Sequence, residues 1–179
     1  MSPLPRYVPD APFPPYAFVP GRFPHPTRDP AGHRHGRALA RPASFDPSRW
    51  RECRPYLVGI DLFNHGYYWE AHEAWESVWH ACGRKGRSGT CLRALIRLAA
   101  AGVKVRETMP GGVRRHAAGA AALVGELDAA LGPAAGRYMG LDLGEVRAFA
   151  EALMLGRRLR DAPPDARVAV VFDFALRVA

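Results

Sequence analysis

Residues 62–79 bring aromatic, acidic and histidine side chains together at helical spacing. Successive residues of an α-helix are about 100° apart around its axis, so His72 and Glu76 lie one turn apart on the same face. A helix that only filled a core would carry Leu and Ala here, because a buried carboxylate or imidazole needs a partner that offsets its lost hydration. This segment is therefore the first candidate for a functional site.

A histidine and a carboxylate at this spacing can give two ligands to a divalent metal ion, as in helical di-metal bundles, or form an acid and base pair that burial tunes. Two ligands do not close a site, and His116 is the best helical candidate for the third. We therefore predict that His72, Glu76 and His116 bind a divalent metal ion. Glu73 is the candidate catalytic base of a hydrolytic reaction.

Four further side chains are candidates for binding a small ligand: Trp69, Trp75, Arg97 and Lys104. A structural alternative exists for all of them. Arg97 and Lys104 lie on one face of their helix and could pair with the carboxylates of residues 73 and 76, in a buried ion network that only fixes the helix register. Tryptophans at helical spacing also belong to a core more often than to a ligand site.

The second functional hypothesis is a non-enzymatic helical interaction module for a protein or nucleic-acid partner. The net charge of +8 and the basic loop of Arg84, Lys85 and Arg87 would suit contacts with phosphate groups. The other basic residues are spread along the chain, however, and the loop lacks the frame of a P-loop. A nucleic-acid partner is thus the less favoured alternative, and a homo-oligomer is left open.

These side chains need helices to position them, and the sequence predicts an all-α protein with a compact bundle of about five helices. The length of 179 residues and the hydrophobic fraction of 48% suit a single core. We divide the chain into a proline-rich extended arm (1–45), a helical domain (46–160) and an extended tail (161–179). Spaced aromatic residues suggest that the arm wraps the domain, and its His33 and His35 could reach the metal site.

Capping and turn residues set the first predicted helix ends. Asp46, followed by proline, begins a helix, and a glycine turn over 64–66 precedes the helix expected over 67–81. A basic, glycine-rich loop is predicted over 83–89. Thr90 would then cap a central third helix.

The later helices follow from the same signals. Small residues at 99–102 would let another helix approach the third one closely. Met109 and Pro110 end the third helix, and Gly132 ends the fourth. Asp142 and Glu145 have the spacing of a capping box at the start of the fifth.

Several protein classes are excluded by composition and motifs. No apolar run is long enough to span a bilayer, and the proline-rich beginning lacks the pattern of a signal peptide, so we expect a cytoplasmic protein. Three cysteines without a C-x-x-C pair indicate neither a disulfide framework nor a zinc ribbon. The sequence also lacks G-x-S-x-G, H-E-x-x-H and dinucleotide-binding motifs.

Two long motifs carry a family resemblance. The segments 61–76 and 92–107 resemble the bacterial family called domain of unknown function 309, and the similarity extends to Arg115-His116-Ala117 and to the arm. The resemblance implies an all-helical domain with the aromatic and acidic helix at its centre. It implies no established activity. The family often has an amide at the position of Arg97, where this chain is expected to form a salt bridge.

Overall fold

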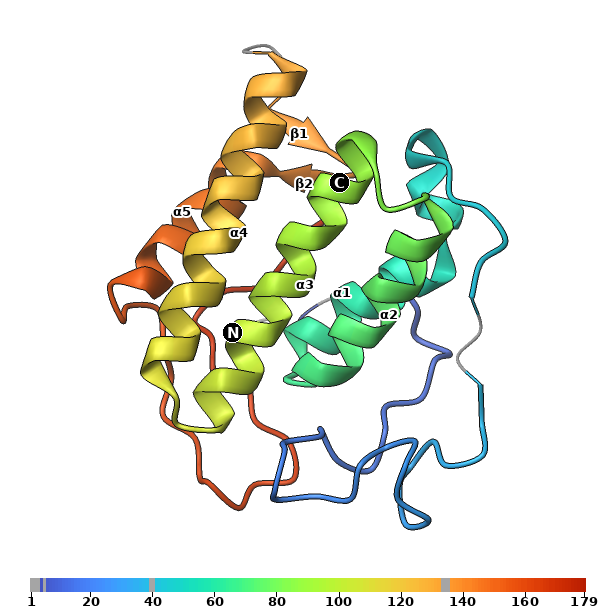
Figure 1. Ribbon diagram of the computed structural model, residues 1–179, viewed down its shortest axis with the longest axis vertical. Coiled ribbons are helices and arrows are strands. Elements are labelled where there is room, and N and C mark those ends of the chain that lie inside the picture. Colours follow the sequence, from blue (N-terminus) through green and yellow to red (C-terminus); the bar gives the residue numbers. More distant parts are fainter. Residues whose placement is uncertain (1–3, 5, 39–40, 133–135) are drawn as a thin grey trace.

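The fold is described by a computed structural model that covers residues 4, 6–38, 41–132 and 136–179 (Figure 1). Over these residues the helices are a 3-10 helix (Pro47–Glu52), α1 (Arg54–Asn64), α2 (Tyr68–Ala81), α3 (Gly86–Arg106), α4 (Pro110–Leu131) and α5 (Leu143–Met154). Two short strands, β1 (Arg137–Tyr138) and β2 (Leu141–Asp142), form an antiparallel pair between α4 and α5. The prediction of an all-α bundle is confirmed.

Helix α3 lies at the centre of the bundle (Figure 1). It packs against α2 on one side and α4 on the other, while α1 packs on α2 and α5 packs on α4. Each helix thus lies beside its neighbour in the sequence, as short connections favour. This order sets one face of α2 opposite α3.

Small residues on α3 let α2 approach closely. A Cβ atom on Gly102 would lie 2.4 Å from Cγ of Tyr68, far inside van der Waals contact. The hydroxyl oxygen of Tyr68 also accepts a hydrogen bond from the backbone N–H of Val171, at 3.0 Å. One buried ring therefore fixes α2 against both α3 and the C-terminal segment.

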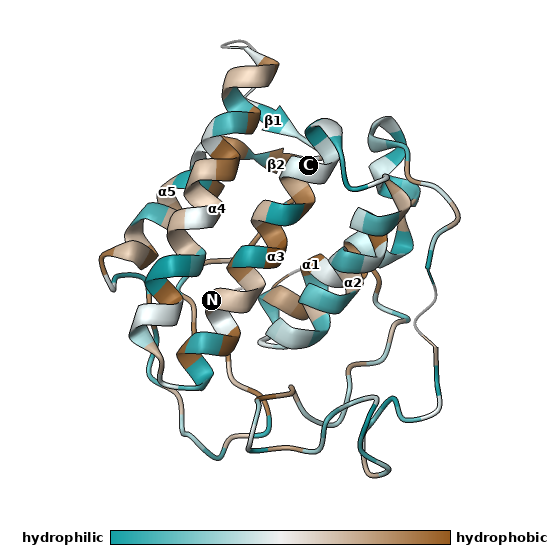
Figure 2. Cartoon of the chain, viewed as in Figure 1, coloured by the Kyte–Doolittle hydropathy of each residue, from teal (hydrophilic) through white to brown (hydrophobic). Residues whose placement is uncertain are grey.

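The helices mix hydrophobic and hydrophilic residues along their length, as expected where one side of a helix faces a core (Figure 2). The largest fully buried side chains include Trp75 of α2, Tyr56 of α1 and Phe172 of the C-terminal segment. Nε1 of Trp75 donates to the carbonyl oxygen of Tyr56 at 3.2 Å, and the Tyr56 hydroxyl donates to that of Met139 at 2.9 Å. The polar ends of both rings are therefore satisfied inside the core.

Two predicted helix starts are confirmed. The side chain of Asp46 accepts from the N–H of Ser48 at 2.9 Å, and Pro47 opens the 3-10 helix. The side chain of Asp142 accepts from the N–H of Glu145 at 3.0 Å and caps α5. Both caps satisfy amide groups that have no partner within the helix.

The predicted start of the third helix is wrong. Helix α3 begins at Gly86, and Thr90 lies inside it rather than capping it. A Cβ atom on Gly89 would lie 2.8 Å from the backbone carbon of Arg84, so this glycine serves a close approach at the helix start. Gly86 and Gly89 were the reason to predict a loop here, because glycine is typical of turns as well as of tightly packed helix starts.

The described part of the N-terminal region, residues 6–38, contains turns and bends and passes below and to the right of the helices in the view of Figure 1. Two buried carboxylates bind its backbone. Asp61 of α1 accepts from the N–H groups of Tyr7 and Val8, at 2.9 and 2.8 Å. Glu70 of α2 accepts from the N–H of Phe18 at 2.9 Å. These contacts place the arm beside α1 and α2.

The chain after α5 returns across the bundle without a further helix. Isolated bridges pair Leu141 with Val178 and Leu159 with Phe172. The amide of Asn64 on α1 exchanges two hydrogen bonds with the backbone of Leu176, each 2.8 Å long. The boundaries proposed at residues 45 and 160 stay a prediction.

Among the helices of the described residues, none is both long and apolar enough to cross a lipid bilayer.

Candidate functional site

Helix α2 holds the side chains that the sequence singled out. Its buried face, which includes Ala71, Trp75 and Val78, packs into the core. His72, Glu73 and Glu76 are half-buried and lie outside that core face. Each offers one ligand atom to a set in which all three atoms lie within 4.8 Å of one another.

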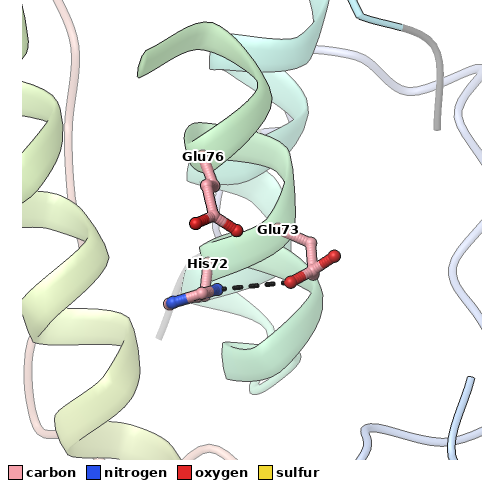
Figure 3. Close-up of side chains that lie close together, drawn as sticks. All are labelled: His72, Glu73 and Glu76. Carbon is pink, nitrogen blue, oxygen red and sulfur yellow. Dashed lines mark ion pairs between the residues drawn. The ribbon is translucent and has the colours of Figure 1, made fainter. Parts of the chain in front are cut away.

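His72 and Glu73 form an ion pair within this set (Figure 3). Nδ1 of His72 lies 3.5 Å from Oε1 of Glu73, and the two side chains are 29% and 26% exposed. The neighbouring imidazole lowers the pKa of the Glu73 carboxyl below its ordinary value, so Glu73 is ionised at neutral pH. The second ring nitrogen of His72 points away from Glu73, and Glu76 lies one turn further along the helix (Figure 3).

His72 and Glu76 line one cleft with side chains of α3 and α4. We call it the α2–α3 cleft. Its volume is about 270 Å³, and the lining residues are His72, Glu76, Trp79, Arg93, Ile96, Arg97, Ala100 and His116. The proposed third ligand, from α4, therefore lies in the same cleft as the first two.

His116 has an unusual environment in this cleft. Its Nδ1 atom is buried without a hydrogen-bond partner among the described residues. Burial lowers the pKa of the imidazole, and the nearby cations Arg115, Arg97 and Lys104 lower it further. The ring is therefore neutral at pH 7, which is the form that binds metal ions.

Three of the predicted ligand-binding side chains lie outside the α2–α3 cleft. Trp69 packs edge-on against Phe18 and His25 of the arm, with ring centroids 5.2 and 5.5 Å apart. Trp75 points into the core, as described above. Lys104 forms an ion pair of 2.6 Å with Glu107, three residues further along the chain. Of the four, only Arg97 lines the cleft.

The predicted ion network is wrong in its pairing. Within the described ranges, no salt bridge joins Glu73 or Glu76 to Arg97 or Lys104. The guanidinium of Arg97 instead lies over α4, where a Cβ atom on Gly119 would be 2.5 Å from its Nη1 atom. The helical spacing predicted which face of α3 carries Arg97 and Lys104. It could not predict the direction in which these two long, flexible side chains extend.

The arm histidines do not join the cleft. Nε2 of His33 lies 3.0 Å from Oε1 of Glu70, and both side chains are 3% exposed. His35 is exposed and lies outside the cleft lining. His33 therefore holds the arm on α2.

A second cavity, of about 490 Å³, adjoins the same carboxylates from the arm side. Its lining includes Arg34, Arg37 and Arg41 of the arm, together with Glu73 and Glu76 of α2. These arginines were not predicted to be neighbours of the site. An extended arm has no periodic pattern that would indicate which of its side chains face the domain.

The basic loop contacts its own domain. The Arg84 guanidinium donates to Nδ1 of His80 and lies 5.5 Å from the centroid of the Trp79 ring. Arg87 donates to the carbonyl oxygen of Ala130 at 2.8 Å. These contacts give both arginines a structural use that needs no partner.

Comparison with known proteins identifies a related family but indicates no activity. Residues 56–116 match the model of a family described as Domain of unknown function (DUF309). The matched segment begins in α1 and ends at His116, so it contains all the predicted metal ligands. No curated protein matches the chain. The match confirms the family resemblance seen in the sequence.

Proposed function

From the match of residues 56–116 to the DUF309 family and from the geometry of α2, we propose that this chain is a member of that family that binds a divalent transition-metal ion. The ligands are the imidazole of His72, the carboxylate of Glu76 and the imidazole of His116. One observation carries the proposal: ligand atoms of His72, Glu73 and Glu76 lie within 4.8 Å of one another on a single rigid helix. Imidazole and carboxylate together suit zinc, iron and manganese.

Little movement is needed to bring the two ligands on α2 to a common metal ion. With metal–ligand bonds of about 2.1 Å in tetrahedral geometry, neighbouring ligand atoms lie about 3.4 Å apart. A change of side-chain rotamer can contract a 4.8 Å cluster to that size. The backbone of α2 already places the side chains one turn apart. Metal binding would therefore have to fix only a few side-chain χ angles, and the loss of conformational entropy would be small.

Glu73 supports the site through His72. Histidines that bind metals almost always donate their other ring N–H to a carboxylate or carbonyl, which fixes the ring orientation. Nδ1 of His72 faces Glu73 at 3.5 Å, and the other nitrogen is left to face a metal ion (Figure 3). The distance is long for a hydrogen bond and would shorten when the metal ion polarises the ring.

Three protein ligands leave a fourth position for water. A zinc ion held by these residues would act as a Lewis acid and lower the pKa of a bound water toward neutrality. Hydrolysis is therefore the reaction class that this site would support. The ionised Glu73 carboxylate would be the candidate group to accept a proton from that water.

The proposal is tested by titrating zinc into the untagged, EDTA-treated full chain by calorimetry. We expect one zinc ion per chain, and affinity at least tenfold weaker in His72→Ala and in Glu76→Gln. The matched controls are His35→Ala and Glu126→Gln, which replace exposed residues away from the cleft. Equal affinity in all five proteins, or absence of zinc binding by the unchanged chain, would overturn the proposal.

A further inference from the structure

The α2–α3 cleft contains more cationic and donor groups than its one carboxylate can satisfy. Among the described residues, no carboxylate lies within 4.0 Å of a nitrogen of Arg93 or Arg97. Nε1 of Trp79, in the same lining, is buried and has no acceptor within the described part of the chain. The buried N–H of Trp79 indicates a ligand with an acceptor atom, because a buried donor without an acceptor is costly. Arg97 is half-buried and Arg93 is exposed at the mouth of the cleft, so both guanidinium groups are free to bind further acceptor atoms of the same ligand.

The lining also limits the size of that ligand. The volume of about 270 Å³ lies just below the range of drug-sized ligand sites, so the occupant is small. Ile96 and Ala100 give the cleft a short apolar wall on α3. Arg97 is half-buried and rests on Gly119, which holds its guanidinium more firmly than an exposed arginine.

We infer that the α2–α3 cleft binds the phosphate group of a small phosphorylated molecule through Arg97, Arg93 and the indole N–H of Trp79. Guanidinium groups bind oxyanions with paired N–H donors. Three donor groups from two helices fit a tetrahedral anion, whose oxygens point in several directions, better than a planar carboxylate.

This inference rests on the proposed function for the use of the bound phosphate, because His72 and Glu76 line the same cleft. Glu76 is the only carboxylate in that lining, and it repels an anion. A metal ion on Glu76 would neutralise this charge and attract a phosphate oxygen. Phosphate and metal are therefore expected to strengthen each other's binding, as linked sites must do reciprocally.

The test titrates inorganic phosphate into the full chain at constant ionic strength, first after EDTA treatment and then with saturating zinc. Binding is followed by calorimetry, with acetate as the carboxylate probe. We expect phosphate to bind the EDTA-treated chain, to bind more tightly with zinc, and to bind more tightly than acetate. Replacing Arg97 by Gln should weaken phosphate binding by at least about tenfold, the usual effect of losing a charge-assisted hydrogen bond.

Two further variants separate the effect of the paired donors from the effect of charge alone. Arg97→Lys keeps the charge and loses the paired donors, so its affinity should fall between those of the original chain and Arg97→Gln. Arg114→Gln removes an exposed charge on α4 and should change nothing. Unchanged binding in Arg97→Gln, equal binding of acetate, or absence of phosphate binding would overturn the inference. Zinc binding without phosphate binding would overturn it and leave the metal site standing, whereas the reverse result would refute the metal site alone.

Discussion

Oε1 of Glu70, on α2, lies 3.0 Å from Nε2 of His33 in the N-terminal arm, and both side chains are 3% exposed. The same oxygen accepts a hydrogen bond from the backbone N–H of Phe18 at 2.9 Å. Glu70 is three residues before Glu73, so one helix holds the arm with one carboxylate and presents another at the candidate metal site. The arm brings Arg34 and Arg37 to that site because Glu70 anchors it.

Replacing Glu70 by Ala should destabilise the protein and release the arm. The N–H of Phe18 would lose its buried acceptor, which costs about 1–3 kcal/mol, and His33 would lose its partner. Urea denaturation should show a lower free energy of unfolding, and limited proteolysis should cut within residues 6–38 more rapidly. Glu126→Ala, at an exposed position of α4, is the control. Similar stability and cleavage in both variants would contradict this role of Glu70.

Replacing Gly102 by Ala should destabilise the contact between α2 and α3. The added methyl group would lie 2.4 Å from Cγ of Tyr68, and such overpacking costs about 1–3 kcal/mol. Gly125→Ala is the matched control, because a Cβ atom there meets only the end of Arg147, at 3.7 Å. Alanine is also the better helix former, so the control should unfold at the same or a higher temperature. If Gly102→Ala melted at as high a temperature as Gly125→Ala, the close contact between α2 and α3 would not need glycine, and the prediction would be wrong.

The pH dependence of stability should report on His116. Burial and nearby cations lower its folded-state pKa from the ordinary value of 6.5, so the unfolded chain binds this proton more readily. The contribution of His116 to stability is therefore complete above about pH 6.5 and is lost as the pH falls through the lowered pKa. Thermal melting between pH 7.5 and 5 should fall less steeply in His116→Gln than in the original chain. The exposed His35→Gln should keep the original slope, and a steeper fall in His116→Gln would refute the assignment.

The sequence predicted the elements of the fold well because local signals set them. Asp46 and Asp142 cap helices where capping patterns placed them, and Gly102 serves the close helix approach that its small neighbours indicated. The start of α3 was misplaced because Gly86 and Gly89 carry the same signal in a turn and in a tightly packed helix start.

The candidate site was predictable only in part. Helical spacing was enough to set His72 and Glu76 on one side of α2, and the shared cleft with His116 agrees with that spacing. The contacts of Arg97 and Lys104 could not be predicted, because each long side chain can reach several neighbours. Lys104 in fact pairs with Glu107, three residues further along the same stretch of chain. The roles of Asp61 and Glu70 in binding the arm were missed as well. Their partners are backbone amides of Tyr7, Val8 and Phe18, and backbone groups leave no trace in a residue pattern.

The central claim is that one metal ion binds between His72 and Glu76, and anomalous diffraction tests it most directly. Crystals of the full chain grown with zinc should show an anomalous peak at the zinc edge, about 2.0–2.2 Å from a ring nitrogen of His72 and a carboxylate oxygen of Glu76. A nitrogen of His116 should complete the protein ligands. Zinc bound only elsewhere, or a cleft without any anomalous peak in zinc-saturated crystals, would contradict the account.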